Sequence, residues 1–105
     1  MITALADGIR VSAELGIEPG AFVEAVSGPR LPSFADGKAR MMLEGAFPPD
    51  FPLRLAHKDL VLLLAALDEA GVGPGLLRDV EARFAAAEER GLGENDVAAV
   101  RAVDL

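Results

Sequence analysis

The chain has 105 residues, which is enough for one hydrophobic core and too few for two domains. Its formal net charge is −7, and this argues against nucleic acid and anionic membrane surfaces as partners. There is no cysteine, so disulfides and thiolate metal sites are excluded, and we expect a cytoplasmic location. The apolar run from Leu60 to Leu67 is far shorter than the roughly 20 residues needed to span a bilayer.

Glycine and proline divide the chain into about six helical segments, and no stretch alternates apolar and polar residues as a strand does. The predicted helices are Ile2 to Leu15, Pro19 to Val26, Phe34 to Glu44, Leu53 to Ala70, Leu76 to Arg90, and a short closing helix through Val103. Ser33 is expected to cap the third helix and Asn95 or Asp96 the last, while Gly28 to Pro32 forms a loop. We therefore predict an all-α fold, a compact bundle forming a single domain over residues 1–105.

The apolar faces of these helices predict self-association. One face of the first helix carries Ile2, Leu5, Ile9 and Ala13, and the fifth helix has a stripe of Leu77, Val80, Phe84 and Ala87. The fourth helix is apolar around most of its circumference, which is typical of a buried helix. Six short helices can cover only part of this surface, so the stripe of the first helix and the fourth helix are expected to pair with another copy.

A charged pair, Lys58 and Asp59, lies near the start of the apolar fourth helix. Because an unpaired buried charge is costly, the pair is expected at an edge, a cleft or an interface. Taken alone, Lys58 is most simply a solvated lysine with a buried stem. Asp59 is either a first-turn acid near the positive end of the helix dipole or a residue that orients Lys58.

The remaining polar residues give little indication of chemistry. His57 is the only histidine, and with no second ligand nearby it is a poor candidate for a metal site. No catalytic partner for it can be named from the sequence. Glu88 and Glu89 are expected on the solvated surface of the fifth helix. Gly71 to Gly75 lies between two helices, so we interpret it as a turn and not as a phosphate-binding loop.

The run Phe51-Pro-Leu-Arg-Leu-Ala-His-Lys-Asp-Leu60 resembles the C-terminal helical domain of the β-hydroxyacid dehydrogenases. This is the family of 3-hydroxyisobutyrate dehydrogenase, glyoxylate reductases and imine reductases. Residues 4–19 resemble the interdomain helix of that family and the turn after it, with Glu18 in place of the usual Asp. Residues 42–51 and 91–97 match its later segments in the same order.

The resemblance implies a role for three residues of this chain. Lys58 would contact the nicotinamide cofactor, NAD or NADP, and Phe51 and Asp59 would bind substrate, a small β-hydroxy acid or a related aldehyde or imine. For Phe51 the alternative is a core aromatic that anchors the proline-rich loop before the fourth helix. The resemblance also implies a homodimer or higher oligomer and a domain that closes a cleft against a Rossmann domain.

Two parts of the family's machinery have no counterpart in this sequence. There is no Gly-x-Gly-x-x-Gly turn, and neither lysine of the chain, Lys38 or Lys58, matches the family's acid/base lysine. No catalytic residue is therefore predicted. We expect the chain to be a C-terminal piece that lacks its Rossmann domain and is inactive alone. The alternative is a stand-alone helical module that oligomerises and performs no chemistry.

Overall fold

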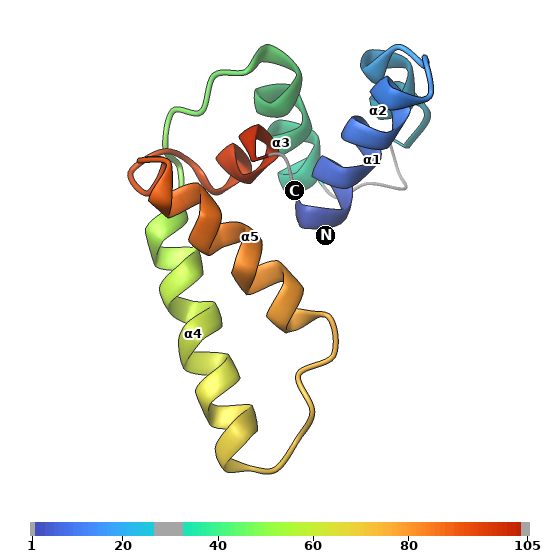
Figure 1. Cartoon of the computed structure of the whole chain (residues 1–105). Coiled ribbons are helices and arrows are strands. Elements are labelled where there is room, and N and C mark those ends of the chain that lie inside the picture. The colour runs from blue at the N-terminus through green and yellow to red at the C-terminus, as the bar shows by residue number, and fades with distance from the viewer. Residues whose placement is uncertain (1, 27–32, 104–105) are drawn as a thin grey trace.

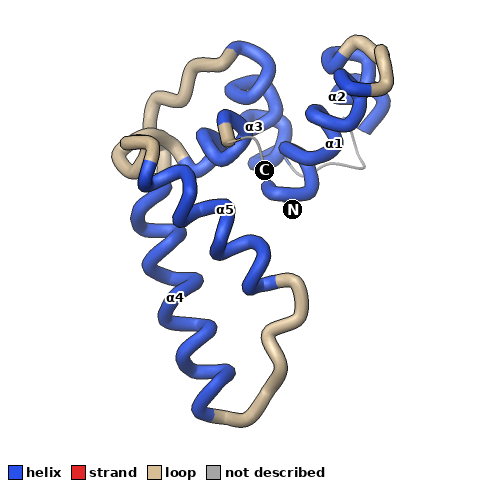
Figure 2. Tube along the Cα trace, in the orientation of Figure 1, coloured by secondary structure: helices blue, strands red, loops and turns tan. Residues whose placement is uncertain are grey.

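In a computed structural model of the chain, which describes residues 2–26 and 33–103, the regular structure is helical (Figure 1). The elements are α1 (Ile2–Glu14), α2 (Pro19–Val26), α3 (Ser33–Glu44), α4 (Leu53–Glu69), α5 (Leu77–Glu89) and the 3₁₀ helix η2 (Val97–Ala102). No strand occurs among the residues described, and Figure 2 shows the helices joined by loops alone. The predicted all-α fold is confirmed. The predicted loop from Gly28 to Pro32 and the side chain of Ser33 lie outside the described residues.

The core forms around η2, which packs against α1, α3, α4 and α5. Ala98 and Ala99 of η2 are completely buried, and their small side chains let the surrounding helices approach closely. The larger core side chains come from four helices and include Leu5, Ile9, Met42, Leu53 and Phe84. A six-residue 3₁₀ helix thus occupies the centre of the bundle. There this segment from the end of the sequence packs against α1 from its beginning.

The apolar stripe of α1 is buried within the chain. Leu5 is 5% exposed and Ile9 is 1% exposed, whereas Ala13 faces solvent. The expectation that this stripe pairs with another copy is therefore wrong for Leu5 and Ile9, because α3 and η2 pack against α1. The stripe predicted on α5 is confirmed at Phe84 and Ala87, which are both buried.

The helices α4 and α5 form an antiparallel arm that projects from the rest of the molecule (Figure 1). The arm accounts for the elongated shape, whose principal extents are 42 × 26 × 26 Å. Leu53 is the one buried residue of α4, and Val61, Leu62 and Leu63 are 43–59% exposed. Within a single chain, the expectation that the fourth helix is buried is thus wrong. The main elements that pack against α4 are α5 and, at its base, η2.

Candidate functional site

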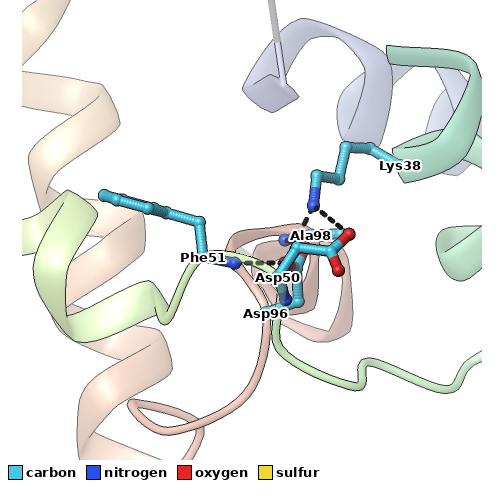
Figure 3. Close-up of polar contacts among 5 residues, drawn as sticks. All are labelled: Lys38, Asp50, Phe51, Asp96 and Ala98. Carbon is cyan, nitrogen blue, oxygen red and sulfur yellow. Dashed lines mark hydrogen bonds and ion pairs between the residues drawn. The ribbon is translucent and has the colours of Figure 1, made fainter. Parts of the chain in front are cut away.

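A buried carboxylate, Asp96, organises the segment that leads into α4. Its Oδ1 accepts hydrogen bonds from the Lys38 ammonium at 2.8 Å and from the backbone amides of Asp50 at 3.0 Å and Phe51 at 3.1 Å (Figure 3). Its Oδ2 accepts from the amide of Ala98 at 2.9 Å, so Asp96 is the N-cap of η2, as the sequence predicts. We call these five residues the polar hub.

The hub holds a fully buried ion pair. The side chain of Asp96 is 0% exposed and that of Lys38 is 3% exposed. Burial is the largest effect on the Asp96 carboxyl and acts to raise its pKa, but the Lys38 ammonium and the three amides together hold the pKa below its usual value. Asp96 therefore stays ionised, with both of its oxygens engaged by donors.

The loop that ends in Asp96 also supplies the start of α4 with hydrogen-bond acceptors. Pro52 precedes the helix and offers no capping side chain. Instead, the first two helical amides, those of Leu53 and Arg54, donate to the carbonyl oxygens of Asn95 at 2.8 Å and Gly93 at 2.9 Å. These amides would otherwise lack partners, so this loop takes the place of a capping side chain and fixes where α4 begins.

Lys58 and Asp59 lie beyond this fixed start, on the exposed surface of α4. Asp59 is six residues past Leu53, so the interpretation of Asp59 as a first-turn acid is wrong. Within the described parts of the chain neither residue forms an ion pair. The Lys58 ammonium, with its three donors, is thus available to a ligand, and Asp59 does not neutralise it.

Phe51 contributes its backbone to the hub and directs its ring elsewhere. Its amide donates to Asp96 and its carbonyl oxygen accepts from the amide of Val97 at 2.9 Å. The ring points away from Asp96 in Figure 3 and is 40% exposed. The interpretation of Phe51 as a core aromatic is therefore wrong. No hydrogen bond or ion pair joins Phe51 to Lys58 or Asp59; what they share is one short segment whose start is fixed by the hub.

His57 has two partners that the sequence does not reveal. Its Nε2 lies 2.8 Å from Glu81 Oε1 and its Nδ1 lies 3.0 Å from Glu88 Oε1. Glu88 therefore has a role beyond the solvated surface expected for it. Burial, the largest single effect, lowers the pKa of His57, but the hydrogen bonds and charges of the two carboxylates outweigh it and the net pKa is raised. The spacing of seven between Glu81 and Glu88 places them on one face of α5, and only the packing of α5 on α4 brings them to His57.

A cavity of about 580 Å³ lies between α1, α4 and α5. Its wall is mainly apolar and includes Leu60, Val80 and Phe84, while Asp7 and Arg83 form an ion pair beside it. Neither Phe51, Lys58 nor Asp59 lines it, so the cavity is separate from the residues predicted to bind cofactor and substrate. No cluster of three potential metal ligands occurs in residues 2–26 and 33–103, and no helix there is long and apolar enough to cross a bilayer.

The sequence model of the NAD-binding domain of NADP-dependent 3-hydroxyisobutyrate dehydrogenase matches residues 1–103. The chain belongs to this family. The family is one of NAD(P)-binding dehydrogenases and includes multidomain enzymes with a Rossmann domain.

Similar proteins agree with this assignment. The chain is 28% identical over 101 residues to glyoxylate/succinic semialdehyde reductase 2, chloroplastic, of Arabidopsis thaliana, and 29% identical over 101 residues to reductase 1 of that plant. It also has the fold of part of a 3-hydroxyisobutyrate dehydrogenase from Salmonella typhimurium, with a TM-score of 0.88 over 98% of this chain at 20% identity. In both comparisons with the reductases 95% of this chain is covered. The chain spans 28%, 35% and 36% of the lengths of these three proteins.

Proposed function

We propose that this chain serves as the C-terminal domain of an NAD(P)-dependent oxidoreductase and that Lys58 contacts the nicotinamide cofactor. The observation that carries the proposal is the place of Lys58: an ammonium on the exposed side of α4 that forms no ion pair with the described residues, a few residues after a helix start fixed by the loop that ends in Asp96. An ammonium presents three donors, which suit the ribose and carboxamide oxygens of a nicotinamide cofactor. The bound cofactor would donate or accept the hydride.

Two further residues are proposed to meet the substrate, a small β-hydroxy acid or a related aldehyde or imine. The exposed ring of Phe51 would form an apolar wall next to the reacting carbon. The exposed carboxylate of Asp59 would accept a hydrogen bond from a substrate hydroxyl group or orient the ammonium of Lys58. The backbone contacts support both functions, because the hub fixes the backbone of Phe51 and the loop that ends in Asp96 fixes the start of the helix that carries Asp59.

The projecting arm supports two roles for the domain as a whole. We propose that the arm closes over the cofactor held by a Rossmann domain and that its exposed apolar face pairs two copies of the protein. Val61, Leu62 and Leu63 are consecutive on α4 and all exposed, so apolar side chains cover much of the helix circumference there, and large exposed apolar surfaces are uncommon on monomers. Sedimentation equilibrium of the 105-residue chain at micromolar concentration should show a dimer or larger species. A monomer across that range would reject the pairing. The cytoplasmic location inferred from the absence of cysteine also remains a prediction.

The same exposed face favours a second candidate function, a helical module that oligomerises and does no chemistry. The two candidates differ in what they require of Lys58: the module has no use for its ammonium, whereas the oxidoreductase domain depends on it. Both predict that the 105-residue chain alone does not turn over glyoxylate or succinic semialdehyde with NADH or NADPH. Turnover by the purified chain, after removal of host dehydrogenases, would contradict both.

Cofactor binding separates the two candidates. In a chimera, this chain would replace the corresponding domain of glyoxylate/succinic semialdehyde reductase 1, and NADPH and NADH would be titrated by calorimetry. Lys58→Ala should weaken binding roughly 10-fold or more, because a hydrogen bond from a charged group contributes about 1.5–3 kcal/mol. Arg78→Ala, which removes another exposed cation from the arm, is the control and should leave the affinity unchanged. Equal affinities of the two variants in correctly folded chimeras would assign Lys58 to the solvated surface.

A further inference from the structure

The contacts of His57 require a particular protonation state. Both ring nitrogens lie within 3.0 Å of a carboxylate oxygen, one from Glu81 and one from Glu88. An ionised carboxylate only accepts hydrogen bonds, and a neutral imidazole has a single N–H donor. One of the two contacts would then set a nitrogen lone pair against a carboxylate oxygen. Both contacts are hydrogen bonds only when His57 carries two protons and a positive charge.

The charges on α5 favour this doubly protonated state. Glu81 and Glu88 are the carboxylates of α5 that meet the ring, and they flank it on both sides, seven residues apart on one helix face. The ring itself is 17% exposed, so water shields these contacts only in part. On α4, Lys58 is exposed and forms no ion pair with any residue that the structure describes, and Arg54 is already paired with Glu94 of the neighbouring loop at 2.7 Å.

The 3₁₀ helix η2, which packs against the base of α4, contributes no charged group to the described contacts of the ring. On η2 the ionisable residue is Arg101, and it lines a small cleft together with Asp7 and Arg10 of α1. Asp96, which caps η2, directs its carboxylate to Lys38 within the polar hub. His57 is therefore the positive partner of a local group whose two carboxylates, Glu81 and Glu88, have no other described ion pair.

We propose that His57 is a pH-dependent clamp that fastens α4 to α5 and so positions Lys58, the next residue on α4. Protonated His57 forms hydrogen bonds with both Glu81 and Glu88 of α5. It therefore ties α5 to α4 at the residue next to Lys58. When the second proton leaves, one hydrogen bond is lost and the arm loosens at that point. The consequence for cofactor binding rests on the function proposed above, whereas the clamp itself does not.

The direction of the pH effect follows from the raised pKa of His57. A histidine whose pKa is higher in the folded chain contributes stability that is fully present below its ordinary value of about 6.5. That contribution is lost as the pH rises through the folded-state pKa. The arm is therefore held most firmly in mildly acidic solution and loosens toward alkaline pH.

A proton NMR titration of the ring tests the clamp directly, because His57 is the only histidine in the chain. Its pKa should lie above 6.5 in the 105-residue protein. Glu81→Gln and Glu88→Gln should each lower it, and the double variant should bring it to 6.5 or below. Glu89→Gln removes the same charge from the same helix without touching the ring, and it is the matched control. A pKa at or below 6.5 in the unmodified chain, or equal effects of the three single variants, would overturn the proposal.

Hydrogen exchange tests whether the clamp holds the arm. Between pH 6 and pH 9, after correction for the intrinsic exchange rate, amide protection of residues 53–69 should fall about two- to fivefold, in keeping with a partly exposed charge pair. The midpoint should match the NMR pKa, and His57→Gln should remove the pH dependence while leaving residues 97–103 unchanged. A flat profile in the unmodified chain would contradict the clamp. Since neither measurement involves a cofactor, failure here is distinct from failure of the proposed oxidoreductase role.

Discussion

The start and the middle of α4 lie in opposite environments. At its base, Leu53 is completely buried, and the helix start is fixed by carbonyl oxygens of the loop before η2 and by the buried pair of Lys38 and Asp96. Along the arm, Val61 and Leu62 face solvent, and α5 is the neighbour that packs along the helix. The start of the helix is thus held by hydrogen bonds and a buried ion pair, whereas the part that follows is apolar and exposed.

This difference fits the division of roles proposed above. A residue that must meet a cofactor atom needs a backbone with one position, and the hub provides it for the segment that includes Phe51 and leads to Lys58. A surface that pairs with another copy needs exposed apolar side chains, and the arm provides these. His57 lies between the two regions and links α4 to α5 where the rigid part gives way to the projecting part.

Removing the hub carboxylate should have the largest effect on the base. Asp96→Ala would leave the buried ammonium of Lys38 without its partner and remove the N-cap of η2. We expect a loss of roughly 3–5 kcal/mol in the free energy of unfolding, measured by urea denaturation. Asp50→Ala, whose carboxylate is 77% exposed and 3.4 Å from Lys38, is the control and should cost about 1 kcal/mol or less. Similar losses for the two variants would mean that the hub does not hold the base.

A charge on the arm should break assembly and spare the fold. Leu62 is 59% exposed, so Leu62→Glu should change the unfolding free energy by only about 0.5 kcal/mol. The proposed dimer should nevertheless weaken roughly 10-fold or more, because two copies of a desolvated side chain are lost. Sedimentation velocity measures the change. Leu15→Glu, at an even more exposed apolar position of 73%, is the control. Equal effects of the two substitutions would place the interface elsewhere.

The two regions should also respond to opposite ends of the pH scale. The pKa of Asp96 is lowered in the folded chain, so its contribution is present above the ordinary carboxyl pKa of 3.8 and is lost as the pH falls through the lowered value. Asp7, whose pKa is lowered chiefly by its hydrogen bond with Arg83, acts in the same direction. Thermal melts from about pH 2 to 5 should show this acid sensitivity below about pH 4, and Asp96→Asn should flatten it. A slope unchanged by Asp96→Asn would assign the acid sensitivity to other groups.

The smallest effect is expected at the ion pair that joins α1 to the arm. Asp7 and Arg83 are 34% and 27% exposed, so solvent screens their attraction. Arg83→Met, which keeps much of the stem, should cost less than about 1 kcal/mol by urea denaturation and even less in 1 M salt. A loss comparable to that of Asp96→Ala would show that the arm is held to α1 as firmly as the base is held together.

Local patterns in the sequence predict the helices well. Glycine and proline positions indicate the bounds of each helix, and the sequence offers Asn95 or Asp96 as the cap of the last helix, of which the structure shows Asp96. The contacts that shape the candidate site are not local. Lys38 and Asp96 are 58 residues apart, and His57 is 24 and 31 residues from its two glutamates. No periodicity indicates which helices meet, so the sequence identifies Lys58 by resemblance but leaves the hub and the clamp undetected.

The exposure of α4 is a second feature that the sequence leaves open. A helix that is apolar around its circumference is consistent with a core helix and equally with a helix whose surface packs against another copy of the protein. Within the single chain, Leu53 is buried while Leu62 is exposed on the same helix. Phe51 is a second case in which the sequence leaves exposure open. Its aromatic ring suggests a core residue, but its backbone binds the hub and its ring points away from Asp96.

Hydrogen exchange of the chimera with and without NADPH tests the central claim most directly, namely that the segment at the start of α4 meets the cofactor. Bound NADPH should raise the protection of amides in residues 51–60 and leave those of residues 70–76, at the tip of the arm, unchanged. Lys58→Ala should reduce the protection at subsaturating cofactor. A cofactor that binds the chimera without altering residues 51–60 would contradict the account.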